Sequence, residues 1–159
     1  MKLLKPIYGI FILTWLLSIP ACQDGKDKPV EKLQHFTSGE VSRRHYEVNG
    51  KKEGMMVDYY PGGKVHSERM FVNDKQTGRM LFYYPSGKMK EVQYFDKNGL
   101  KTSADSIFYE GGQLQMLMNF KEGKKDGYLR KYNEDGSLVF EAKYAMDTLV
   151  EVKGQSISK

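Results

Sequence analysis

A histidine, a hydroxyl and a carboxylate stand together at His66-Ser67-Glu68, the residue types from which enzymes build a nucleophile and its general base. The flanking residues predict a β-strand, and successive strand residues point to opposite faces of a sheet. His66 and Ser67 would then diverge instead of forming a hydrogen-bonded pair. We therefore expect no catalytic site at this trio, and we predict that the protein is not an enzyme.

Carboxylates recur after predicted turns at Glu68, Glu91 and Glu141. Paired carboxylates can act as acid and base or hold calcium, but these lie in separate predicted hairpins without an aspartate-rich calcium loop. We expect them to pair across strands with lysines such as Lys64 and Lys143. One cysteine and three histidines in 159 residues are too few for a thiolate zinc site or a histidine cluster. The sequence predicts neither a metal nor a cofactor.

Cys22 has a context that predicts covalent lipidation. Two lysines precede an apolar stretch at residues 7–20, which is shorter than the roughly 20 residues that a membrane-spanning helix needs. We predict a helical lipoprotein signal peptide at residues 1–21, because Ala21 stands directly before the cysteine as in a lipoprotein box. The alternative is a plain secretion signal in which Cys22 is incidental.

Acyl chains on Cys22 would anchor the protein to a membrane, because each buried CH₂ contributes about 0.8 kcal/mol. We therefore predict a lipid-anchored protein of the bacterial cell envelope, and Gln23 after the cysteine favours the outer membrane. Residues 22–40 are polar and interrupted by glycine and proline, which predicts a flexible tether, with a short helix around Val30–His35 as the alternative. A net charge of only +5 argues against a nucleic-acid partner.

The rest of the chain is an internal repeat. Four glycines, at positions 63, 87, 112 and 136, follow one another at intervals of 24, 25 and 24 residues. An aromatic residue stands four positions before each of them, and in three units another glycine stands nine positions before. The residues that define the repeat are Gly54, Tyr59, Gly63, Gly78, Tyr83, Gly87, Phe108, Gly112, Gly127, Tyr132 and Gly136.

Each unit predicts a β-hairpin, because short runs rich in tyrosine, phenylalanine, valine and methionine alternate with turn dipeptides such as Pro61-Gly62. The positions two and eight after the second glycine are apolar or aromatic, and we expect them to share one face of a strand. We predict an all-β protein of tandem antiparallel hairpins over residues 41–153. These hairpins would form one elongated, twisted sheet of about nine or ten strands, followed by a disordered tail at 154–159.

Tyr60, Tyr84 and Tyr109 directly follow the repeat aromatics, so alternation predicts a second aromatic row on the opposite face. One interpretation is structural, since tyrosine can cover a thin sheet while its hydroxyl stays hydrated. The other is a binding strip for a protein, a glycan or a lipid headgroup, because exposed aromatics are common at interaction hot spots.

The repeat pattern resembles the MORN-repeat-variant family, bacterial proteins often labelled YwqK-family antitoxins. The Gly-x(4)-Tyr-x(3)-Gly-x-apolar units and turns such as Asn49-Gly50-Lys51 carry this resemblance over about residues 44–152, with departures at Asp74, Ser103 and Asp147-Thr148. The resemblance implies tandem hairpins that bind proteins or lipids, without shared catalytic residues. It therefore predicts a non-catalytic binding or scaffolding module. The alternative is an antitoxin or immunity-type inhibitor of a toxin that acts in the envelope.

Overall fold

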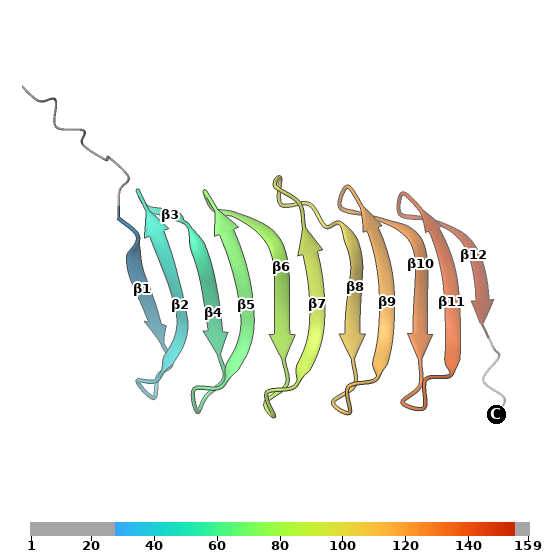
Figure 1. Ribbon diagram of the computed structural model, residues 1–159, viewed down its shortest axis with the longest axis horizontal. Coiled ribbons are helices and arrows are strands. Elements are labelled where there is room, and N and C mark those ends of the chain that lie inside the picture. The colour runs from blue at the N-terminus through green and yellow to red at the C-terminus, as the bar shows by residue number, and fades with distance from the viewer. Residues whose placement is uncertain (1–27, 155–159) are drawn as a thin grey trace, which may run out of the picture.

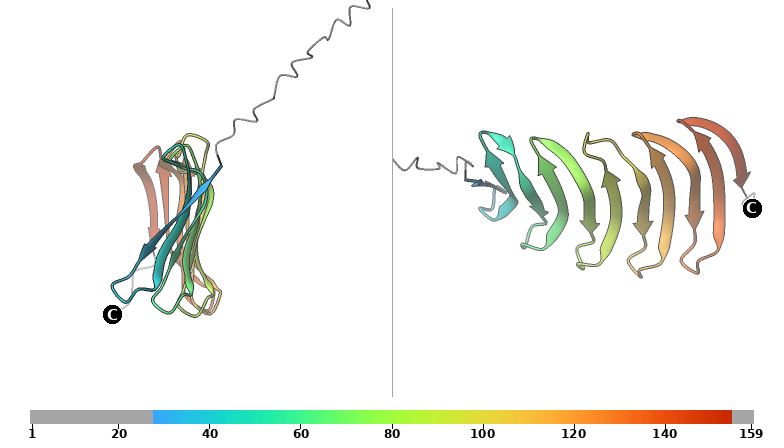
Figure 2. Two further views of the ribbon diagram at one scale, coloured as in Figure 1. Left: turned by 90° about the vertical axis from the view of Figure 1, so that its left-hand side faces the viewer. Right: turned by 45° about the horizontal axis from the view of Figure 1, so that its top comes forward.

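The computed structural model describes residues 28–154. They form one open antiparallel sheet of 12 strands, in which hydrogen-bonded neighbours follow chain order and only β3 lies off the main path (Figure 1). Seen from its end, the sheet is a thin, bowed single layer (Figure 2). The strands are β1 (Val30–His35), β2 (Val41–Val48), β3 (Lys51–Lys52), β4 (Gly54–Tyr59), β5 (Val65–Val72), β6 (Lys75–Tyr83), β7 (Met89–Phe95), β8 (Ser103–Phe108), β9 (Leu114–Lys121), β10 (Lys124–Tyr132), β11 (Leu138–Ala145) and β12 (Thr148–Gly154). The predicted all-β fold of tandem hairpins is confirmed.

Several predictions concern residues that the structure does not describe. The signal peptide at 1–21, the lipidated Cys22 and residues 155–159 of the predicted tail all lie outside the described residues. Gly154, the first residue of that predicted tail, is the last residue of β12.

Two kinds of turn connect the strands, and they alternate except between β7 and β8, where the Asp96 N–H donates to the Leu100 carbonyl (2.9 Å) in the wide-turn pattern. In the wider turn of the first repeat, the Tyr60 N–H donates to the Lys64 carbonyl (2.8 Å) and the Gly63 N–H donates to the Tyr60 carbonyl (3.1 Å). The tight turn that follows has Asn73 and Asp74 at φ values of 50° and 67°. Two successive positive φ values match the twist of an antiparallel hairpin, which explains why asparagine, aspartate and glycine recur there.

A β-bulge beside each wide turn overturns one prediction about the faces. Val65 and Phe71 were expected to share a face, but Val65 lies opposite Tyr59 and Phe71 lies opposite Gly54. Tyr59 and Gly54 are an odd number of residues apart on a regular strand, so the two side chains lie on opposite faces. The same register shift occurs in the hairpins β6–β7, β8–β9 and β10–β11. The extra residue of each bulge reverses the alternation within the strand.

Both faces of the single layer bury apolar side chains. Following the register across the strands, one face carries Met56, Met80, Met118 and Ala142, and we call it the methionine face. The other, the valine face, carries a continuous row of cross-strand partners that includes Val57, Leu81 and Val92. All of these residues are at most 8% exposed. In a sheet with no second layer, neighbouring long side chains cover them.

The sheet begins earlier than the sequence predicts. Residues 22–40 were expected to be a flexible tether, but Val30–His35 forms β1 and pairs with β2. The connecting turn repeats the wide-turn pattern, with the Phe36 N–H donating to Glu40 (2.9 Å) and the Gly39 N–H to Phe36 (3.0 Å). Gly39 lies one repeat length of 24 residues before Gly63, so an additional hairpin precedes the first predicted unit. This hairpin, with β3 and β12, brings the strand number above the predicted nine or ten.

Candidate binding surface

The tyrosine row predicted from the sequence connects neighbouring repeats. The hydroxyl of Tyr60 donates to the Tyr83 carbonyl (2.8 Å), and the hydroxyl of Tyr84 donates to the Phe108 carbonyl (2.7 Å). The hydroxyl of Tyr109 donates in the same way to the carbonyl of the repeat aromatic in the following unit, at 2.9 Å. All three tyrosines are half-buried. Each therefore fixes its own ring and satisfies a backbone acceptor of the next repeat.

The His66-Ser67-Glu68 trio does not converge. Ser67 is 1% exposed, and its hydroxyl donates to Asp58 Oδ2 (2.9 Å). The His66 ring packs instead between aromatic rings, with its centroid 4.6 Å from that of Tyr60. Glu68 lies on the valine face and accepts a hydrogen bond from another tyrosine hydroxyl at 2.9 Å. The three side chains thus have separate structural partners.

An ionic cluster on the methionine face surrounds Asp58. Its carboxylate is paired with Arg43 at 2.5 Å and with Arg69, and it accepts the Ser67 hydroxyl. Burial by itself would raise the pKa of Asp58. The hydrogen bonds from Arg43 and Ser67 and the charges of both arginines outweigh burial, so the pKa lies below its ordinary value. The cluster ties β2, β4 and β5 together.

A second buried carboxylate, Asp105, lies further along the same face. It is 5% exposed and is paired with Lys101 at 2.5 Å. Burial raises the pKa of Asp105 above its ordinary value, the nearby Glu91 carboxylate adds to this effect, and Lys101 opposes it. This carboxyl group therefore holds its proton more tightly than Asp58 does.

The expected pairing of recurrent glutamates with lysines is wrong. Glu68 accepts from the Tyr83 hydroxyl (2.9 Å), and Glu91 accepts from the Gln93 amide (2.5 Å). Glu141 pairs with Arg130 at 2.7 Å. The register places Glu68 and Glu91 opposite apolar residues. Glu141 lies between Arg130 and Lys153 and forms its ion pair with Arg130, whereas the Lys64 ammonium at the turn donates to the Pro85 carbonyl (2.8 Å).

Two hollows occupy equivalent positions between repeats on the methionine face. One, of about 280 Å³, is lined near the N-terminal end by Phe36, Arg43 and Asp58, among others. The other, of about 310 Å³, is lined by Tyr109 and Lys131 and by further residues near the C-terminal end. Phe36 and Tyr109 hold the same place in their repeats, three repeat lengths apart, as do Asp58 and Lys131. The repeat geometry thus recreates one hollow with different side chains.

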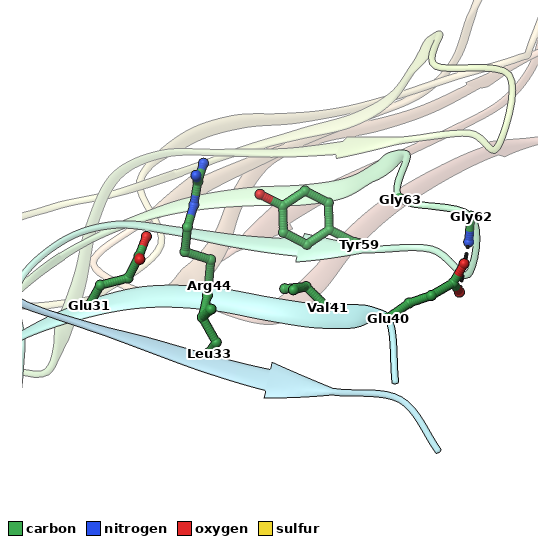
Figure 3. Close-up of a pocket in the computed structure, with 8 residues that line it drawn as sticks. All are labelled: Glu31, Leu33, Glu40, Val41, Arg44, Tyr59, Gly62 and Gly63. Atoms are coloured by element: carbon green, nitrogen blue, oxygen red, sulfur yellow. Dashed lines mark hydrogen bonds between the residues drawn. The ribbon is translucent and has the colours of Figure 1, made fainter. Parts of the chain in front are cut away.

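A wider groove of about 530 Å³ lies on the valine face at the N-terminal end of the sheet. Figure 3 shows the Arg44 and Tyr59 side chains standing on the same side of the strands, with Glu31 beside them. The Glu40 carboxylate closes one end by accepting the Gly62 N–H at 3.2 Å. β1 and its turn, which were predicted to be a tether, build one wall of this groove.

The described part of the chain, residues 28–154, contains no group of three or more histidine, cysteine, aspartate or glutamate side chains placed to hold a metal ion. Among the same residues there is no helix long and apolar enough to cross a membrane.

Comparison with known proteins gives one family match. The family described as "MORN repeat variant" matches residues 52–73 and 76–97. None of the curated proteins matches the chain significantly. Among solved structures, a mutant of S. aureus TarM in complex with fondaparinux, alpha-GlcNAc-glycerol and UDP is 10% identical, with a TM-score of 0.40. That similarity covers 62% of this chain and 21% of the TarM chain.

The two matched segments coincide with the hairpins β4–β5 and β6–β7, in which the glycine and tyrosine columns are complete. These two consecutive hairpins are thus the part of the chain that is similar to MORN repeat variants.

Proposed function

We propose that the protein is a non-catalytic binding or scaffolding module, held at the bacterial cell envelope by acyl chains on Cys22. The observation that carries the binding role is the recurrence of one hollow between different pairs of repeats on the methionine face. A repeated sheet multiplies equivalent surface positions and varies the side chains in them, as extended repeat proteins do when they recognise partners. The match of two hairpins to MORN repeat variants supports the same role.

The hollow between the third and fourth repeats offers the better-preorganised surface. Tyr109 presents a ring that its hydroxyl bond holds in place, and Lys131 adds an exposed positive charge. An amide from Gln115 completes the polar lining. Aromatic faces, amides and one cation suit a partner that combines apolar and polar groups, such as an envelope protein or glycan.

Site-specific photocrosslinking in intact cells tests the binding role. A photoreactive residue at Val139, which lines this hollow, should give discrete adducts of defined mass. The matched control places the same residue at Lys143, which is exposed on the same strand but lies on the valine face. Tyr109→Ala should remove the Val139 adducts. Adducts that are equal at both positions, or that survive Tyr109→Ala, would refute the assigned surface.

Fractionation tests the anchor separately. Cys22→Ser should move the protein from the membrane fraction to the soluble fraction, because the acyl chains supply most of the membrane affinity. Unchanged membrane partition of the serine variant would contradict the lipid anchor without bearing on the hollow.

A further inference from the structure

Among residues 28–154, the last strand of the sheet has a free edge. β12 (Thr148–Gly154) pairs with β11 on one side and ends the strand order on the other. Three of its apolar side chains are more than half exposed: Leu149 (52%), Val150 (58%) and Val152 (52%). An edge strand with unpaired backbone groups and exposed apolar side chains is a template for pairing with another strand.

From this edge we infer that β12 pairs antiparallel with β12 of a second copy, about a two-fold axis at Val152. This goes beyond the proposed binding function, since it concerns the assembly of the chain with itself. The chemistry of the strand selects both the partner and the register.

The faces of β12 restrict the possible registers. Glu151 and Lys153 lie on the valine face, opposite Lys143 and Glu141, while Val152 lies opposite Ala142 on the methionine face. A two-fold axis perpendicular to the sheet keeps each face on its own side. Directly opposite residues must then share a face, so the axis has to pass through a residue and not between two.

Charge selects one of the registers that remain. An axis at Glu151 would set two glutamates opposite each other, and an axis at Lys153 would set two lysines opposite each other. An axis at Val152 sets valine against valine and places each Glu151 opposite the Lys153 of the other copy. Opposite charges directly across antiparallel strands stabilise a pair, and like charges destabilise it. The strand is therefore self-complementary in the register centred on Val152.

The other free edge fits less well. In β1, two-fold registers centred on Leu33 or Gln34 avoid like charges, but they set Lys32 opposite Gln34 or Phe36, so neither has a reciprocal lysine–glutamate pair. Joining β12 to the β1 of a translated copy would create a parallel pair, because the strands alternate in direction along a path of odd length. Parallel pairing is slightly less stable per residue.

Disulfide trapping tests the interface in the full chain carrying Cys22→Ser. Directly opposite Cα atoms in an antiparallel pair are about 4.5–5.5 Å apart, within the range that a disulfide spans. Val152→Cys should therefore give a covalent dimer when the purified protein is oxidised with copper phenanthroline. The matched control is Leu33→Cys on β1, an apolar edge residue that is 46% exposed. This control should stay monomeric.

A charge exchange tests the register. Adding Lys153→Glu to the Val152→Cys variant should lower the yield of covalent dimer roughly tenfold, because both cross-strand ion pairs become repulsive. Adding Glu151→Lys as well should restore the yield. Circular dichroism of each variant verifies that the sheet is intact.

Three results would overturn the inference: no dimer from Val152→Cys, an equal yield from Leu33→Cys, or a covalent dimer that forms only in a double variant carrying both Val152→Cys and Leu33→Cys. The last result would indicate parallel joining of β12 to β1. Failure of the double exchange to restore the dimer would overturn the register at Val152.

Discussion

Removing one tyrosine hydroxyl should measure how strongly neighbouring repeats are connected. Tyr84→Phe deletes the group that donates to the Phe108 carbonyl at 2.7 Å and leaves the half-buried ring in place. The net value of such a hydrogen bond is about 1 kcal/mol, because unfolding returns both groups to water. We expect the free energy of unfolding to fall by about 1 kcal/mol.

An equivalent hydrogen bond occurs in three repeats, so replacing all three tyrosines should give a larger loss of stability that is easier to detect. Tyr60 and Tyr109 donate to carbonyls of the following repeats at 2.8 and 2.9 Å. The three bonds lie in successive repeats and share no partner, so replacing all three tyrosines by phenylalanine should cost about 3 kcal/mol. Because repeats stabilise one another through nearest-neighbour interfaces, this loss should appear in the global transition.

The assay is urea unfolding followed by circular dichroism. The midpoints of the variants are compared at a constant m-value, the slope of unfolding free energy against urea concentration. Tyr94→Phe is the control, because that ring is 37% exposed and its hydroxyl reaches no partner within residues 28–154. It should change the unfolding free energy by less than about 0.5 kcal/mol. If Tyr84→Phe is no more destabilising than this control, the hydroxyls do not connect the repeats, and the row would have to be explained by binding alone.

Further variants test the ionic clusters and the turns. Asp58→Asn should lower the free energy of unfolding by about 2 kcal/mol near pH 7. The lowered pKa of Asp58 gives stability that is present above the ordinary aspartate pKa and is lost as the pH falls through the lowered pKa. The difference in unfolding free energy between the variant and the unchanged protein should therefore shrink in acid. The raised pKa of Asp105 makes its ionisation cost stability as the pH rises. In urea titrations, the unfolding free energy of the unchanged protein relative to that of Asp105→Asn should therefore fall as the pH rises. Ser103→Gly should raise the unfolding free energy by about 1 kcal/mol, since Ser103 has a φ of 63°. Gly127→Ala should lower it by about 2 kcal/mol in thermal melts, because φ is 108° and a Cβ would meet the Asn119 side chain at 3.0 Å.

The repeat was readable from the sequence because its signals are local. Glycine at a positive φ, as at Gly63 (φ 78°), marks a turn wherever the chain needs one, and the residues between turns alternate as strands do. The hairpin of β1 was missed although Gly39 keeps the 24-residue spacing. Its strand reads Val-Glu-Lys-Leu-Gln-His, without the aromatic residues that marked the later units, and every residue in it is exposed. An edge strand carries few of the apolar contacts that make a strand recognisable.

Side-chain partners were harder to predict, because they depend on register. The bulge beside each wide turn reverses the alternation, so Val65 and Phe71 lie on opposite faces despite their even spacing. The glutamates consequently bind tyrosine, glutamine and arginine side chains instead of the expected lysines. Bulges arise from the hydrogen-bond geometry of two strands together and leave no periodic signal in one.

The amino-acid sequence alone determined the period of this protein, the positions of its turns from the first predicted unit onward and its all-β class, because each depends on the conformational preferences of a few adjacent residues. Only the tertiary structure decided which side chains share a face, which tyrosine hydroxyls connect one repeat to the next, and where the sheet ends. Those features depend on how strands separated by many residues align, and a shift of one residue moves every following side chain to the other face.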